Sequence, residues 1–173
     1  MEKHGTNIKK HDLVLPCFLD RLTDRYPKAK TESIKHRVVS MVDYKNSILR
    51  DLSFLLNSNS HMQNKEFDDN FYAKKSVLNY GITPISGSSI SDDKRKEIEK
   101  NIKNTIANYE SRIRQESLEV KLVGSNESNG NCTIELIISG ELLPLITYEK
   151  MYIKTIIDIE TGIYRLRELK QDS

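Results

Sequence analysis

Apolar residues along this chain follow one spacing up to about residue 109 and another beyond it. Over 93–108 they recur every three or four residues, which places them on one face of a helix. Over 118–122 and 132–138 they alternate with polar residues, which is typical of half-buried strands. The pattern therefore predicts helices in the first part of the chain and strands in the second.

Three helices are expected before the change of spacing. A short helix covers 16–26, and the longest covers 33–57 with an apolar stripe of about six turns at 3.6 residues per turn. The third covers 93–108. The polar stretch 58–73 is expected to be an exposed loop, and Gly81 suits a position of positive φ.

Four strands are expected after it, over 118–122, 132–138, 151–157 and 163–169, with a turn over 125–131. The last two strands are close enough to form a hairpin. Because helices and strands are segregated along the chain, we expect an α+β domain in which N-terminal helices pack on a C-terminal three- to four-stranded antiparallel sheet.

The final strand carries too much charge for the centre of a sheet. Charged side chains suit an edge strand, where they discourage indiscriminate pairing and where a partner protein can add a strand. The candidate partner-binding residues on this strand are Tyr164, Arg165, Leu166 and Arg167.

Length and charge limit the classes of protein that fit. A chain of 173 residues suits one domain, expected over 16–173, preceded by a mobile polar arm over 1–15. The 27 basic and 25 acidic residues give a net charge of +2, without the strong positive field of a dedicated nucleic-acid binder.

Neither a membrane segment nor a cofactor site is expected. No apolar run approaches the roughly 20 residues that cross a bilayer, and the polar N-terminus lacks the apolar core of a signal peptide, so we expect a cytoplasmic protein. Cys17 and Cys132 are too far apart in sequence to suggest a zinc site, and no nucleotide-binding glycine loop is present. We therefore predict no metal and no cofactor.

The junction between helices and strands holds the main candidate site. Glu110 and Arg112 are two residues apart, and in an extended segment they project to the same side. An adjacent guanidinium favours the ionised carboxylate, which is the wrong direction for the general acid of a glycosidase. The junction is therefore a candidate assembly site, and we predict no enzymatic activity.

Another charged pair, Arg50 and Asp51, lies in the second half of the longest helix. The broad apolar stripe there favours burial, which is costly for an ion pair that is not fully hydrogen-bonded. The alternative is that both charges lie on the solvated side, since most charged side chains stay exposed.

Four segments in order and spacing resemble one family. They are 18–22, 49–57, 76–81 and the junction itself. Together, across about 16–169, they are similar to TssE baseplate subunits of type VI secretion systems, part of the phage baseplate-wedge family once labelled "lysozyme-like". The segments that carry the resemblance include, as structural motif residues, Arg50, Asp51, Asn57, Asn79, Tyr80 and Gly81.

The family's Glu-Pro-Arg signature maps onto Glu110, Ser111 and Arg112, so this chain departs from it at the proline. Proline fixes its own φ and restricts the preceding residue, which pre-sets the exit from the helix. Ser111 lacks that restriction.

The resemblance implies a non-enzymatic subunit of the baseplate wedge, located at the cytoplasmic face of the inner membrane. It implies the wedge subunits TssF, TssG and TssK and the contractile sheath subunits TssB and TssC as partners, with strand addition to the edge starting sheath polymerisation. A peptidoglycan-cleaving enzyme and a generic interaction adaptor are the alternatives.

Overall fold

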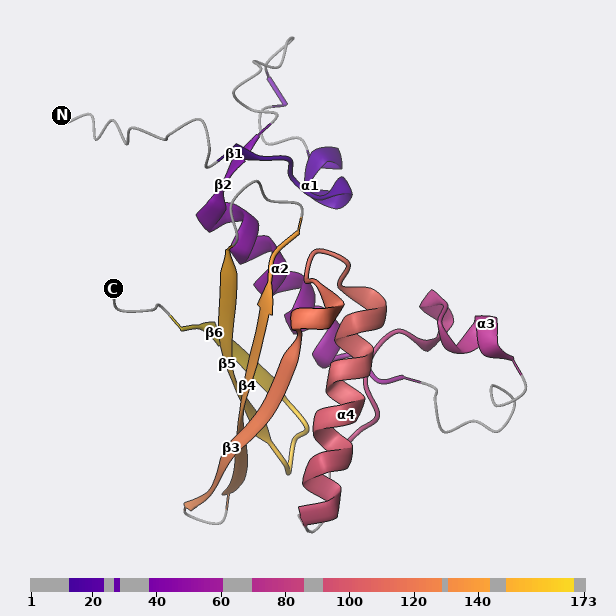
Figure 1. Ribbon diagram of the computed structural model, residues 1–173, viewed down its shortest axis with the longest axis vertical. Coiled ribbons are helices and arrows are strands. Elements are labelled where there is room, and N and C mark those ends of the chain that lie inside the picture. The colour runs from indigo at the N-terminus through magenta and orange to yellow at the C-terminus, as the bar shows by residue number, and fades with distance from the viewer. Residues whose placement is uncertain are drawn as a thin grey trace, which may run out of the picture. The chain divides into compact units, whose positions relative to one another are not determined.

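The computed structural model describes residues 13–23, 27–28, 38–60, 70–85, 92–128, 131–143 and 149–169 (Figure 1). The chain forms two compact units, 1–48 and 49–173, and the boundary falls inside one helix. The predicted arm over 1–15 lies almost entirely outside the described residues, and a single domain over 16–173 stays a prediction.

The first unit contains a two-stranded ladder and a short helix. β1 (Leu13–Val14) pairs antiparallel with β2 (Val39–Ser40), and α1 covers Phe18–Leu22. The predicted helix over 16–26 is therefore present but shorter. It ends at Leu22, after which Thr23 has extended backbone dihedrals and its hydroxyl donates to Leu19 O at 3.1 Å.

The main helix, α2, covers Met41–Leu56. The prediction that it begins at residue 33 is wrong, because residues 38–40 are not helical. Val39 is in β2, since β-branched side chains favour extended backbone. Ser40 then begins the helix, because its Oγ accepts from Asp43 N at 3.1 Å and donates to the Asp43 carboxylate at 2.8 Å. Residues 33–37 lie outside the described part of the chain.

The second unit is built on a four-stranded antiparallel sheet in the order β3-β4-β5-β6, which confirms the predicted α+β class (Figure 1). Its strands are β3 (Glu119–Ser128), β4 (Asn131–Glu141), β5 (Lys150–Asp158) and β6 (Tyr164–Glu168). β6 is an edge strand, as its charge predicts.

The turn predicted over 125–131 is mostly strand instead. Ser125 pairs with Ile134 and Ser128 with Asn131, so the ladder continues past the bulge between Leu122 and Gly124. The polar residues there give no strand signal in the sequence, because this part of the ladder is held by backbone hydrogen bonds and needs no apolar side chains.

Alternate residues of the strands form a mainly apolar face, which also includes the buried Thr155. On β4 and β5 this face is fully buried, with Ile134 and Ile157 both 0% exposed. α4 (Asp92–Tyr109) lies along β3 and buries Ile102 and Ile106, in agreement with the predicted helix over 93–108 (Figure 1).

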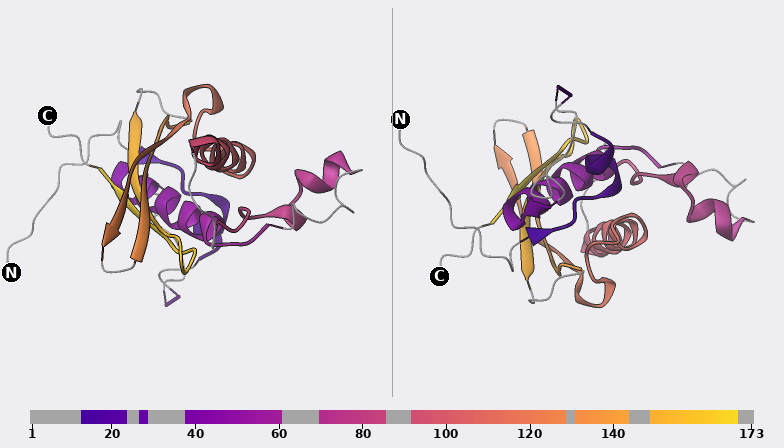
Figure 2. Two further views of the ribbon diagram at one scale, coloured as in Figure 1. Left: turned by 90° about the horizontal axis from the view of Figure 1, so that it is seen from below. Right: turned by 90° about the horizontal axis from the view of Figure 1, so that it is seen from above.

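Three shorter helices complete the described part of the second unit. They are α3 (Phe71–Lys74), which projects away from the sheet in both views of Figure 2, η4 (Val77–Asn79) and η5 (Gln115–Ser117). The loop predicted over 58–73 is thus helical at its end. Asn59 also forms a parallel bridge with Ile82.

Candidate assembly site

The junction after α4 is a tight turn, so the extended backbone predicted there is wrong. Glu110 N still donates to Ile106 O at 2.8 Å, and Ile113 N donates back to Glu110 O at 3.4 Å. The turn nevertheless brings the two predicted side chains together. Arg112 Nε donates to Glu110 Oε1 at 2.7 Å, and Arg112 NH2 lies 2.5 Å from Glu110 Oε2.

This ion pair is almost fully removed from water. The Glu110 side chain is 6% exposed and that of Arg112 is 15% exposed. Arg112 N also donates to Glu110 Oε1 at 3.1 Å, so one carboxylate holds both the backbone and the side chain of the arginine. Two parallel N–H···O bonds fix the guanidinium plane as well as its position.

Asp51 is the third member of this charge cluster. The sequence singled out this residue but did not reveal its contact with Arg112. Its Oδ2 lies 2.6 Å from Arg112 NH2, and its Oδ1 accepts from Arg50 Nε at 2.9 Å. Burial by itself lowers the pKa of Arg112, but the hydrogen bonds and charges of Glu110 and Asp51 outweigh it and raise that pKa above its ordinary value. The arginine is therefore permanently charged and joins α2 to the junction.

Neither interpretation of Arg50 and Asp51 describes the pair fully. The Arg50 side chain is 39% exposed and that of Asp51 is 27% exposed, so the pair lies at the margin of the core. Asp51 contacts the less exposed Arg112 through Oδ2 and the more exposed Arg50 through Oδ1. The carboxylate is thereby satisfied by two guanidinium groups.

The segment 76–81 packs on the end of α4. The rings of Tyr80 and Tyr109 meet edge to face with centroids 5.4 Å apart, and Tyr109 OH donates to Ser76 O at 2.9 Å. Burial, then the nearby charges of Asp51 and Glu110, raises the pKa of Tyr80. The buried Asn79 donates from Nδ2 to Lys74 O at 3.1 Å, which fixes the turn from α3.

Beyond the junction the chain is bonded to the end of β4. Leu143 N donates to Arg112 O at 2.7 Å, and Arg114 N donates to Glu141 O at 2.8 Å. A Cβ on Gly140 would lie 2.5 Å from Ile113 Cγ2, so the absence of a side chain there allows this close approach. The junction is therefore a rigid part of the sheet layer.

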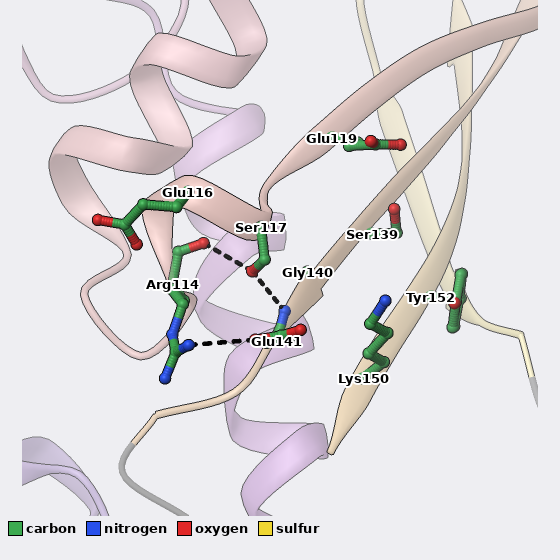
Figure 3. A pocket seen from close by; sticks show the side chains of 9 residues that line it. All are labelled: Arg114, Glu116, Ser117, Glu119, Ser139, Gly140, Glu141, Lys150 and Tyr152. Carbon is green, nitrogen blue, oxygen red and sulfur yellow. Dashed lines mark hydrogen bonds and ion pairs between the residues drawn. The ribbon is translucent and has the colours of Figure 1, made fainter. Parts of the chain in front are cut away.

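A polar hollow of about 480 Å³ opens beside this segment (Figure 3). Ser117 Oγ accepts from Glu141 N at 2.8 Å, and Arg114 NH1 lies 3.4 Å from Glu141 Oε2. Glu119, another acid on its wall, is exposed, and its hydrogen bond with Lys121 lowers its pKa. A general acid for glycoside cleavage needs a raised carboxyl pKa, so Glu119 has the wrong environment for that role.

The predicted partner-binding residues of β6 differ in exposure. Tyr164 is 4% exposed, and burial raises the pKa of its hydroxyl. Arg165 and Arg167 are exposed, and Leu166 is half-buried. The structure therefore removes the Tyr164 side chain from the surface that a partner can reach.

A protein-family model described as baseplate wedge protein gp25 matches residues 42–143, more than half of the chain. The chain belongs to the baseplate wedge protein gp25 family. TssE belongs to the same family, so the resemblance in the sequence is confirmed at that level. Membership identifies a structural baseplate component of a contractile injection system.

The gp25 match includes Asp51, Asn57, the segment 76–81 and the junction, but it stops before β5 and β6. Neither curated proteins nor solved structures gave a match. Within the described residues of this gp25 family member, no helix is long and apolar enough to cross a membrane, and no group of three or more His, Cys, Asp or Glu side chains is placed to hold a metal ion.

Ser111→Pro is expected to leave the free energy of unfolding unchanged or raise it by up to about 1 kcal/mol. Ser111 is the second residue of the turn closed by Ile113 N and Glu110 O, a position that favours proline. In the described part of the chain its N–H has no acceptor to lose. Thermal unfolding checks this, with Ser111→Ala as the control for the hydroxyl. A large fall in Tm for the proline variant alone would contradict it.

Proposed function

We propose that this gp25 family member is a non-enzymatic baseplate subunit of a type VI secretion machine, which helps form the wedge and starts sheath polymerisation. The observation that carries the proposal is the family match over 42–143, which includes the paired Glu110 and Arg112. The partners are the wedge subunits TssF, TssG and TssK and the sheath subunits TssB and TssC. The assembled protein lies at the cytoplasmic face of the inner membrane.

The edge of β6 supplies a physical route for strand addition. Asp158 N donates to Ile163 O at 3.0 Å and Leu169 N donates to Tyr152 O at 2.8 Å, so odd-numbered residues of this strand bond to β5. Backbone groups alternate in direction along an antiparallel strand. The N–H and C=O of Leu166 therefore point outward, where a sheath strand can pair with them.

In this proposal the Glu110–Arg112 pair keeps the platform in shape. Its burial and its bonds to Asp51 favour this role over direct contact with a partner. The pair joins α2, α4 and the end of β4, so it maintains the sheet layer to which β6 belongs. Loss of either charge is accordingly expected to reduce sheath assembly.

A peptidoglycan-cleaving enzyme is the first alternative. Both carboxylate oxygens of Glu110 face the Arg112 guanidinium, and the side chain is only 6% exposed, so this acid is not presented to a cell-wall substrate. Turnover of purified cell-wall material that is lost on Glu110→Gln would favour the enzyme and contradict the proposal.

A generic adaptor is the second alternative, and co-purification separates it from a baseplate subunit. We expect the tagged chain, recovered from cells that assemble the machine, to carry wedge and sheath subunits. Leu166→Pro should reduce the sheath subunits at least severalfold, because proline removes the outward N–H without breaking a ladder bond to β5. Leu166→Val is the matched control, since it also shortens the side chain but keeps the N–H. Equal sheath recovery with both variants would contradict strand addition at β6.

A further inference from the structure

The edge of β3 is partly closed by a side chain from α4. Glu99 Oε1 accepts from Leu122 N at 2.6 Å, so this outward N–H already has a partner. Directly after it, the register shifts between Leu122 and Gly124. A bulge of this kind bends the strand and interrupts the row of groups that another strand needs. Of the two sheet edges, β3 is therefore the poorer template for an added strand.

On the edge of β6, a side chain occupies the outward backbone groups of Tyr164. Tyr164 N donates to Asn57 Oδ1 at 2.9 Å, and Asn57 Nδ2 donates to Tyr164 O at 3.0 Å. The side-chain amide thus makes the same two bonds that a residue of an added strand would make. Asn57 is 107 residues away in sequence and comes from the end of α2.

The orientation of the Asn57 amide is fixed by a third bond. Nδ2 also donates to Ser53 O at 2.8 Å, one of the carbonyls at the end of α2. Both amide hydrogens therefore face carbonyls while the amide oxygen faces an N–H, and a flipped amide would satisfy none of the three. Only asparagine or a close amide analogue can make this arrangement.

We propose that Asn57 sets the register of strand addition at β6 by occupying the outward backbone groups of Tyr164. This rests on the proposed addition of a strand to that edge. The incoming strand begins to pair at Leu166 and cannot continue to Tyr164, so the amide acts as a stop. A fixed starting residue matters because a shift of one residue exchanges the two faces of the added strand.

The neighbouring charges identify the kind of strand that fits. Arg165 and Arg167 are exposed and project from the face opposite to the buried Tyr164. Residues of opposite charge on adjacent strands stabilise pairing, and like charges oppose it. The partner is therefore an extended segment of another protein that alternates acidic residues on the outer face with apolar residues on the inner face. A second β6 strand, with its own arginines, is disfavoured.

Amide hydrogen exchange on the full chain tests the stop. In the free protein, Asn57→Ala should speed exchange of the Tyr164 amide by about tenfold, the effect of one lost hydrogen bond. Asn57→Asp is the second variant, because it is isosteric but has no hydrogens to donate to Tyr164 O. Core amides of β4 and β5 report whether either variant remains folded.

The same measurement with a probe peptide tests the register. A short peptide that alternates glutamate and valine should slow exchange at Leu166 in the wild type and at both Leu166 and Tyr164 in Asn57→Ala. The matching lysine–valine peptide should protect severalfold less. The proposal is overturned if no amide of β6 is protected, if the Leu122 amide of β3 is protected instead, or if protection in Asn57→Ala stops at Leu166.

Failure of this inference can be distinguished from failure of the proposed function. If Asn57→Ala pairs in the same register while sheath subunits still co-purify, the stop is wrong and the baseplate role stands. If sheath subunits are absent even with the wild-type chain, the baseplate role itself fails.

Discussion

Arg112→Ala is expected to lower the free energy of unfolding by about 3–5 kcal/mol, as when one partner of a buried ion pair is removed. The substitution leaves the Glu110 carboxylate, 6% exposed, without the two guanidinium bonds that compensate its burial. It also removes the guanidinium bound to Asp51 Oδ2 at 2.6 Å. Urea denaturation of the purified chain measures the effect.

A partly exposed ion pair on the same sheet provides the matched control. Lys154 Nζ lies 2.9 Å from Glu135 Oε2, with side chains 38% and 26% exposed. Lys154→Ala should cost at most about 1 kcal/mol, because solvent screens such pairs. If Arg112→Ala and Lys154→Ala lower the free energy of unfolding by similar amounts, burial of Glu110 does not add to the cost of removing its partner.

A double substitution separates the effect of the Glu110 and Arg112 charges from the effect of their side-chain volume. Glu110→Gln together with Arg112→Met removes both charges at similar volume, and it should recover much of the stability lost in Arg112→Ala. If this double variant folds but no longer supports sheath assembly, the charges act on a partner. If it folds and assembles sheath, their role is structural.

Hydrophobic periodicity was sufficient to predict the elements that lie against the core. The helix expected over 93–108 is α4, because its apolar residues must cover the sheet and this fixes a helical spacing. The four strands and their antiparallel order follow from alternation and short connections in the same way. The charged residues of β6 predicted an edge strand, because charged side chains discourage further pairing, and β6 is at an edge of the sheet.

Elements with little apolar burial were predicted less well. The ends of β3 and β4 carry polar residues over 125–131, and their pairing depends on backbone bonds that sequence pattern does not reveal. The start of α2 depends on the Ser40–Asp43 cap, a local signal weaker than the apolar residues that precede it.

The candidate site was predicted in part. Glu110 and Arg112 are close in sequence, so their pairing follows from local spacing. Asp51 lies 61 residues from Arg112, and Asn57 is also distant from its partner Tyr164. Such contacts depend on where 49–57 lies in the folded second unit. Periodicity drew attention to Arg50 and Asp51 but gave no partner in the second half of the chain, and the resemblance marked 49–57 without giving its contacts.

Gly81→Ala is expected to cost about 2–5 kcal/mol, combining backbone strain with overpacking. Gly81 has φ +117°, which side chains of L-residues rarely adopt. A Cβ there would also clash with Ser58 O and lie 2.6 Å from Ser58 C, and both are backbone atoms that cannot rotate away. The contact is tight because Ile82 N donates to Ser58 O at 2.9 Å and Ser60 N donates to Ile82 O at 3.0 Å.

Two other glycines separate the components of this cost. Gly162 has φ +69°, and a Cβ added there would meet nothing within 4 Å, so Gly162→Ala should cost about 1–2 kcal/mol from backbone strain alone. Gly124 also has open space and no positive φ, so Gly124→Ala should be nearly neutral in urea denaturation. The decisive comparison is between Gly81→Ala and Gly162→Ala. If both lower the free energy of unfolding equally, the backbone at the bridge between Asn59 and Ile82 shifts to accommodate the added methyl group. A larger loss at Gly81 means that this bridge holds 76–81 rigidly beside Asp51 and Glu110.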